Sequence, residues 1–208
     1  MIRLRQLLAE LKYSENFRLD ALDEIGDASA KPFKWTQSQN ITQEVKSFIP
    51  RLIPGISADL DFAYYFENDQ GVEYIVLLRG QLQNKLMNPF DSRPGIDYDS
   101  YYVLSYNTVK NFQKNVETET NLGEVYRIMS TVTSIVVDFL EQVKKSGYPV
   151  KTLAISAKDD SKSGVSSMES RRGRLYANYI KKQLVQLGGD YRVQAANDRV
   201  ELIWIGNV

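Results

Sequence analysis

A long one-sided helix pattern constrains this chain more than any other feature. Between Val125 and Val143, apolar residues recur at intervals of three and four. These residues are Val125, Ile128, Met129, Val132, Ile135, Val136, Phe139, Leu140 and Val143. The spacing puts them on one face of an α-helix, and that face is wide enough to lie across a β-sheet. The chain must therefore supply a sheet for this helix to cover.

The residues at both ends of the pattern set the limits of the helix. Asn121 and Glu124 have capping-box spacing, in which each side chain satisfies a free backbone amide at a helix start. At the other end, the segment KKSGYP (144–149) places two cations before a glycine, as helix C-termini favour. We therefore predict one long helix between these two signals.

Runs rich in β-branched and aromatic residues precede the helix. DFAYYFEN (61–68) and VEYIVLLRG (72–80) are separated by DQG, which predicts an antiparallel hairpin. YYVLSYNTV (101–109) predicts a third strand, and the polar stretch KNFQKNVETE (110–119) predicts a loop. The part of the core before the helix is therefore expected to be a unit of three antiparallel strands.

The segment after the helix continues the alternation of strand and helix. VKTLAISA (150–157) predicts a strand, and its helical neighbours favour a buried parallel pairing. SSME (166–169) is a second capping-box pattern, and it opens a helix that runs to about Leu187. YRVQA (191–195) and RVELIWIG (199–206) flank a turn and predict a closing hairpin.

The first 58 residues carry a weaker pattern. Residues 2–12 predict an amphipathic helix, and residues 13–58 predict an irregular arm with a short helix near Gln43–Phe48. We expect residues 1–58 to pack as helix and arm on a core formed by residues 59–208. The predicted fold class is α/β of the α+β type, with a central mixed sheet of about six strands and two main helices packed on it.

The composition narrows the chemistry available to the chain. Its 26 basic and 26 acidic residues cancel, which argues against a protein that coats nucleic acid or lies on an anionic membrane. The chain contains no cysteine and no histidine, so thiolate nucleophiles and the commonest general base are missing. No stretch approaches about 18 uninterrupted apolar residues. We expect no membrane contact and no metal site, carboxylate-only sites being the one kind left open.

One strand-loop-helix unit is locally basic within this neutral chain. Its candidate partner-binding or anion-binding residues are Lys158, Lys162, Arg171, Arg172 and Arg174. Four interpretations are open. They are a solvated helix face, pairing with the acidic loop DSRPGIDYDS (91–100), docking to an acidic protein partner, and binding of a phosphate or nucleic-acid backbone at a helix start.

Adjacent tyrosines supply a second candidate surface. Tyr64 with Tyr65, and Tyr101 with Tyr102, send one ring to each side of a strand, because successive side chains alternate. One ring of each pair should lie in the core. The other ring lies either on an exposed face of the kind enriched at protein interfaces or beneath a second covering layer such as the N-terminal arm.

The predicted order of elements resembles the core of the GNAT acyltransferase superfamily over roughly residues 60–208. That order is three antiparallel strands, a long helix, a strand, a second helix and a final strand pair. SRRGRLYANYIKKQLVQLGGDYRV (170–193) is similar to the family's A-x-x-L-Y-x-x-x-G-F-like phrase. The resemblance implies an acyl-CoA-dependent activity in which Tyr176 protonates the leaving thiolate. The alternative for Tyr176 is a ring packed on the sheet.

The cofactor phrase of that family differs in this chain. GNAT enzymes hold the cofactor pyrophosphate with an R/Q-x-x-G-x-G/A phrase at the start of the long helix, where this chain has TETNLGEVYRIM (118–129). Gly123 is the one glycine, and Glu119 and Glu124 beside it disfavour a bound diphosphate. The sequence therefore favours a non-enzymatic protein without a cofactor. An acyltransferase would have to use Gly123 for the cofactor and Tyr176 as the acid.

A second resemblance bears on the origin of the chain. The phrases AISAKDDSKSG, SRRGRLYANYI and DEIGDASAKPFKW are similar to phrases in small proteins of tailed bacteriophages. We therefore expect a phage-encoded virion-associated or accessory protein, located in the host cytoplasm or the virion. It would act through contacts with a protein partner such as another virion subunit. The alternatives are an acyltransferase with an atypical cofactor loop and a nucleic-acid-binding accessory protein that uses the basic helix.

Overall fold

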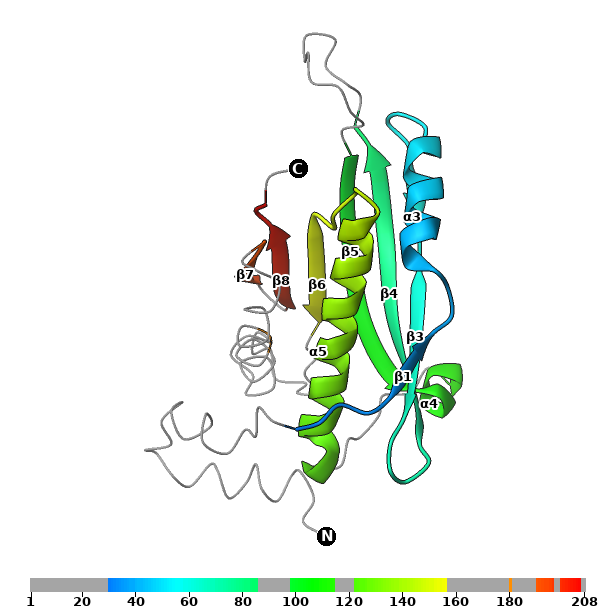
Figure 1. Cartoon of the computed structure of the whole chain (residues 1–208), viewed down its shortest axis with the longest axis vertical. Coiled ribbons are helices and arrows are strands. Elements are labelled where there is room, and N and C mark those ends of the chain that lie inside the picture. The colour runs from blue at the N-terminus through cyan, green and yellow to red at the C-terminus, as the bar shows by residue number, and fades with distance from the viewer. Residues whose placement is uncertain are drawn as a thin grey trace, which may run out of the picture.

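The computed structural model of the chain describes residues 30–85, 98–114, 122–156, 180, 190–196 and 199–206. In this part of the chain, eight strands form one sheet, and helices α3 and α5 lie on one of its faces (Figure 1). The strands are β1 (Trp35–Gln37), β2 (Ser57–Asp59), β3 (Phe62–Glu67), β4 (Glu73–Asn84), β5 (Tyr98–Thr108), β6 (Thr152–Ser156), β7 (Tyr191–Ala196) and β8 (Arg199–Trp204). The helices are α3 (Ile41–Phe48), α4 (Val109–Lys114) and α5 (Leu122–Lys145), with the short 3-10 helix η2 (Ile49–Arg51).

The sheet is antiparallel except at one pair of strands. Its order is β1-β3-β4-β5-β6-β8-β7, and β2 pairs with β4. β5 and β6 run parallel over Tyr101–Leu104 and Thr152–Ile155, with α5 between them in the chain. The structure thus confirms the hairpin of β3 and β4, the third strand β5, the parallel pairing of β6 and the closing hairpin of β7 and β8. It also confirms the predicted α+β class with a mixed sheet.

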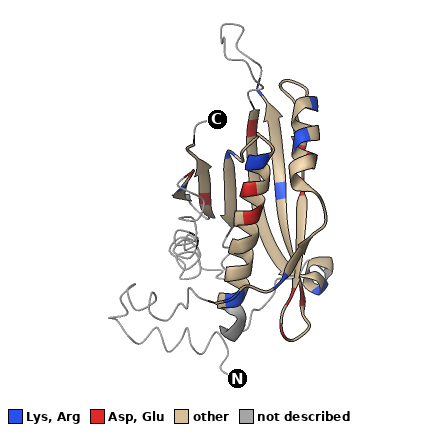
Figure 2. Cartoon of the chain, in the orientation of Figure 1, with Lys and Arg blue, Asp and Glu red and all other residues tan. Residues whose placement is uncertain are grey.

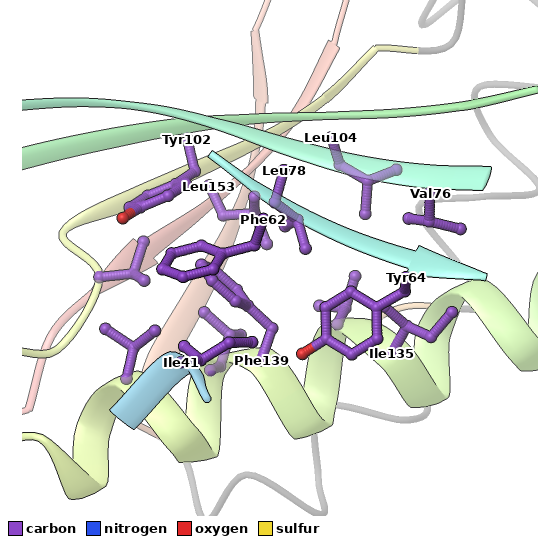
Figure 3. Packing of buried hydrophobic residues seen from close by; sticks show 14 of the residues in the cluster. Ile41, Phe62, Tyr64, Val76, Leu78, Tyr102, Leu104, Ile135, Phe139 and Leu153 are labelled. Carbon is purple, nitrogen blue, oxygen red and sulfur yellow. The ribbon is translucent and has the colours of Figure 1, made fainter. Parts of the chain in front are cut away.

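The apolar stripe of α5 packs on the inner face of the sheet, which we define as the face that α5 covers (Figure 3). The stripe residues Ile128, Met129, Val132, Ile135, Val136, Phe139, Leu140 and Val143 are each at most 4% exposed. Strands β3 to β6 contribute the facing side chains, among them Phe62, Tyr64, Leu78, Tyr102 and Leu153. Each fully buried side chain of this size stabilises the fold by about 1.5–3 kcal/mol. This contact is therefore the main source of stability.

Gly80 is required where Tyr102 crosses β4. A Cβ atom at Gly80 would lie 2.3 Å from Cε1 of Tyr102 and 2.6 Å from the carbonyl oxygen of Leu60. At this point β4 changes partner from β3 to β2. The Leu60 N–H donates to the Gly80 carbonyl at 3.0 Å, and the Gly80 N–H donates to Oδ1 of Asp61 at 3.1 Å. These two bonds bridge the point at which the partner of β4 changes.

The segment before β2 packs on the inner face as well. Phe33, Ile41 and Val45 are buried in the same cluster as the stripe of α5. Helix α3 begins after Asn40, whose Oδ1 accepts a hydrogen bond from the Gln43 N–H at 3.2 Å. This cap explains why a short helix forms in a segment otherwise rich in helix breakers.

A second stripe of α5, which we call the polar stripe, holds this segment in place. It consists of Arg127, Thr131, Ser134, Asp138 and Gln142. Oγ1 of Thr131 accepts the Phe33 N–H at 2.9 Å, and Nε1 of Trp35 donates to Oγ of Ser134 at 3.3 Å. Nε2 of Gln142 donates to Oε1 of Gln37 at 2.7 Å. The Arg127 guanidinium carbon lies 3.9 Å from the centroid of the Phe33 ring. These contacts fix the segment at three points, Phe33, Trp35 and Gln37.

Two sequence predictions need correction. The sheet has eight strands rather than about six, because β1 and β2 are only three residues each and show no alternating pattern. Residues 110–114, predicted as a loop, belong to α4. Oγ1 of Thr108 accepts the Asn111 N–H at 3.2 Å, which is a helix N-cap. The α-helices of the described residues are therefore α3, which matches the predicted short helix, α5, which matches the predicted long helix, and α4, which the sequence does not predict. Ile180 of the predicted second helix is helical and buried, and the rest of that helix lies outside the described residues.

Two buried tyrosines of the inner face should respond oppositely to loss of the hydroxyl. The Tyr64 hydroxyl donates to Oδ2 of Asp138 at 3.0 Å, whereas the buried Tyr102 hydroxyl has no hydrogen-bond partner in the described part of the chain. Tyr64→Phe should lower the free energy of unfolding by about 1.5–3 kcal/mol, because a bond to a charged group is lost. Tyr102→Phe should be neutral or raise it by about 1 kcal/mol. Urea unfolding with matched slopes measures both, and equal losses would contradict this prediction.

Candidate functional site

The residues predicted for binding and catalysis lie mostly outside the described part of the chain. Lys158, Lys162, Arg171, Arg172, Arg174 and Tyr176 fall between β6 and β7, where the structure describes only Ile180 and Asp190. Gly123 is the second residue of α5. Its N–H therefore belongs to the first turn, whose amides have no partner within the helix. Of the acidic loop 91–100, the structure describes Tyr98, Asp99 and Ser100, and Oδ2 of Asp99 lies 3.5 Å from Nζ of Lys85.

The tyrosine pairs divide between the two sides of the sheet, as the alternation predicts. Tyr64 is 0% and Tyr102 1% exposed on the inner face. Their neighbours point to the opposite side, where Tyr65 is 41% exposed and Tyr101 is half-buried. The prediction that one ring of each pair lies in the core is therefore confirmed. Phe33 and α3 pack on the inner face, so this segment of the arm does not cover Tyr65 or Tyr101.

Strands β3, β4 and β5 build a continuous surface around these two outward rings. We call it the outer face and define it as Tyr65, Leu77, Arg79, Gln81, Tyr101, Val103 and Ser105. Register brings its members together, because Leu77 lies opposite Ser105, Arg79 opposite Val103 and Gln81 opposite Tyr101. Arg79, Gln81 and Ser105 are exposed, while Leu77 and Val103 are half-buried. The outer face is thus a mixed aromatic, aliphatic and polar surface with one cation near its centre.

The outer face continues onto β6 and β8. Tyr101 pairs with Thr152 and Val103 with Ala154, which is 0% exposed. On β8, Ile203 lies opposite Thr152 and Glu201 opposite Ala154. Because Ala154 is fully buried, the exposed apolar atoms of the outer face are those of β3, β4 and β5 and do not run on without a break across β6.

The polar groups of the inner face serve the fold. Oδ2 of Asp138 accepts bonds from the Tyr64 hydroxyl at 3.0 Å and from Nε2 of Gln142 at 2.6 Å. Burial raises the pKa of Tyr64, and the Asp138 carboxylate raises it further. Tyr64 therefore keeps its proton at neutral pH. Nor does the described part of the chain contain a group of three or more acidic side chains arranged to hold a metal ion.

The charges of the described residues are mixed in sign. Along α5, basic and acidic residues are interspersed on the side shown in Figure 2. Nζ of Lys144 lies 2.5 Å from Oδ2 of Asp190, and Nζ of Lys145 lies 3.9 Å from Oε2 of Glu141. Such exposed pairs contribute little to stability. In this view, the described residues therefore present no surface of a single sign to a polyanion.

The pairing between the parallel strands β5 and β6 ends near the middle of β5. They pair only as far as Leu104 and Ile155, while β5 continues to Thr108 alongside β4. The pairing of β4 with β5 is unbroken from Tyr74 with Thr108 to Asn84 with Tyr98. An acyl-CoA site of the kind the resemblance implies would lie where β5 and β6 diverge, next to the start of α5. Glu119, beside Gly123 in the sequence, lies outside the described residues.

Comparison of the chain with protein-family models, with curated proteins and with solved structures finds no match. Among the described helices, none combines the length and the apolar character needed to cross a membrane.

Two features of the structure are absent from the sequence predictions. Leu77, Arg79 and Val103 were not singled out, because their role depends on which strands are neighbours. The polar stripe of α5 does carry a sequence signal, since its members recur at intervals of three and four on the flank of the apolar stripe. A search for two helical stripes instead of one would have found it.

The buried tyrosines should make the fold sensitive to alkali. Burial raises the pKa of Tyr64, Tyr98, Tyr102 and Tyr191 above the ordinary value of about 10. Above that pH the unfolded chain releases these protons and the folded chain keeps them. Their contribution to stability is therefore complete below about pH 10 and is lost as the pH rises further. Tyrosinate absorbance should show at least these four rings ionising together with the loss of circular dichroism. Ionisation of every tyrosine near pH 10 in a still-folded chain would contradict this.

Proposed function

We propose that the chain is a non-enzymatic protein that acts through contacts with another protein, and that the outer face is its docking surface. One observation carries the proposal: Tyr65 is 41% exposed on a sheet face that also presents Tyr101, Leu77 and Val103. Tyrosine and arginine are the residues that protein interfaces favour, and Arg79 stands among these apolar side chains.

The proposal includes an origin and a second contact. The similarity of AISAKDDSKSG and SRRGRLYANYI to phage phrases supports a phage-encoded protein that is virion-associated or accessory. Its partner would then be another virion subunit. Arg171, Arg172 and Arg174 would contribute charge-assisted bonds to carboxylates of that partner. Nucleic-acid binding by these arginines is the alternative, and it would weaken steeply with added salt.

A GNAT-like acyltransferase is the second candidate function, and one observation favours it. The described residues contain three antiparallel strands, the long helix α5, the parallel strand β6 and a final strand pair in this sequence, which agrees with part of the order on which the resemblance rests. The second helix of that order lies outside the described residues except for Ile180. The cofactor would lie where β5 and β6 diverge, with Gly123 in the first turn of α5 beside its pyrophosphate. Tyr176 would be the acid.

Truncation of exposed side chains on the outer face should weaken binding of the partner protein. Tyr65→Ala with Arg79→Ala takes two exposed side chains from the surface, so the fold should be unchanged. Because such anchors dominate interface energies, we expect partner affinity to fall at least about tenfold. The measurement is co-purification from the cells that naturally produce the chain, followed by titration of the recovered partner.

The matched control is Lys46→Ala, which removes an exposed side chain of α3 on the other side of the sheet. It should leave the partner bound. If the outer-face variant keeps its partner and charge reversal of Arg171, Arg172 and Arg174 loses it, the contact lies on the basic segment instead. Retention by both variants would refute docking through either surface.

Acetyl-CoA decides between the two candidate functions. A ligand that binds only the folded state raises the melting temperature by mass action, and saturation at about a hundred times Kd adds about 2.7 kcal/mol. Under the protein-contact proposal, millimolar acetyl-CoA should leave the melting temperature unchanged. A rise that desulfo-CoA reproduces and that Tyr176→Phe leaves intact would show cofactor binding and favour the acyltransferase.

A further inference from the structure

β7 ends the sheet, and half of its backbone groups point away from β8. In the order of the described strands, β7 has β8 as its one neighbour. The Ile205 N–H donates to the Asp190 carbonyl at 2.9 Å, just before Tyr191 pairs with Trp204. Hydrogen-bonded and non-bonded pairs alternate along an antiparallel ladder. The amide and carbonyl of Val193, like those of Tyr191 and Ala195, therefore point outward.

The neighbouring ladder confirms this alternation independently. The Trp204 N–H donates to the Lys151 carbonyl at 2.9 Å, on the side of β8 away from β7. Trp204 lies opposite Tyr191, so the pair Tyr191 with Trp204 is a non-bonded one. The outward groups of Tyr191 belong to the edge of the sheet.

Among the described residues, this edge lacks four of the devices that keep sheet edges from pairing. Its register with β8 is unbroken from Tyr191 to Ala196, so there is no bulge, and the strand contains neither proline nor lysine. The other edge strand, β1, is only three residues long. Short strands, bulges, prolines and lysines are the usual protections of an edge. β1 is protected because it is short, whereas the six residues of β7 offer a longer edge.

We propose that β7 pairs antiparallel with β7 of a second copy of this chain, about a two-fold axis at Val193. An axis at this central outward residue overlaps the whole strand, whereas an axis at Tyr191 or Ala195 overlaps only part of it. The outward groups of Tyr191 then meet those of Ala195 in the second copy. Val193 meets its own equivalent. Every outward amide from Tyr191 to Ala195 thus gains a partner.

The side chains of this strand are self-complementary in that register. Arg192 lies opposite Gln194 of the second copy, and both side chains are exposed. Within one chain, Nη2 of Arg192 already lies 3.4 Å from Oε1 of Gln194, which shows that the two groups suit each other on this face. No charge faces a like charge across the axis. A two-fold contact of this kind is closed, so it gives a dimer rather than a fibre.

The oligomeric state of the full chain tests the pairing. Sedimentation equilibrium should find a reversible dimer over a concentration series. Gln194→Glu should tighten the dimer and Gln194→Lys should loosen it, each by about 2- to 30-fold, because two symmetric cross-strand pairs change together. A monomer at every concentration overturns the proposal, as does a dimer that responds to neither substitution.

Val193→Pro and Val193→Ala form a matched pair for the backbone bonds. Both variants lose the valine side chain, and only proline removes the outward N–H, which makes no bond to β8. Val193→Pro should abolish the dimer, while Val193→Ala should retain it with the same circular dichroism.

If Val193→Pro does not fold, disulfide formation between two copies tests the position of the axis instead. The chain has no cysteine, so Val193→Cys should give a covalent dimer on mild oxidation and the outer-face control Ser105→Cys should not. The opposite result overturns the axis at Val193.

Discussion

The contact between the apolar stripe of α5 and the inner face of the sheet governs the rest of the structure. Phe139 lies 5.0 Å from the ring of Tyr102 and 5.7 Å from that of Phe62, centroid to centroid. These rings come from different strands, so one helix residue fixes β3 and β5 relative to each other. Gly80 follows from the same contact, because the ring of Tyr102 occupies the space that a side chain on β4 would need.

The polar stripe of α5 gives the helix a second role. Hydrogen bonds to charged or buried partners add specificity where apolar packing alone would tolerate sliding. Thr131 meets the backbone of Phe33, and Gln142 meets Gln37, so the segment 33–37 has one position along α5. This segment in turn adds β1 to the sheet beside β3. One helix thus organises both the core and the segment that enters it.

Sequence analysis succeeded where local periodicity and tertiary structure agree. The stripe from Ile128 to Val143, the hairpins and the division of Tyr64 from Tyr65 follow from alternation, a property that each segment shows alone. The sequence does not predict the elements that are too short to show a pattern of their own, such as the three-residue strands β1 and β2. β1 and β2 exist only because a longer strand offers them a partner, and α4 exists because Thr108 caps it at the end of β5. The composition of the outer face also depends on strand order. Residues 77, 79 and 103 therefore become a surface only after the sheet is assembled.

The single parallel pairing has a consequence for how the chain folds. Strands β3 to β5 are joined by antiparallel neighbours along the sequence, so their contacts form early and at low entropic cost. Tyr101 pairs with Thr152, and the whole of α5 lies between them in the chain. Bringing these two residues together therefore closes a long loop, which costs more conformational entropy than closing a hairpin. β8 and β7 reach the rest of the described sheet through β6. The hairpin of β7 and β8 also joins neighbours along the sequence, so the step that depends on this long closure is the docking of the hairpin on β6 rather than the pairing within it.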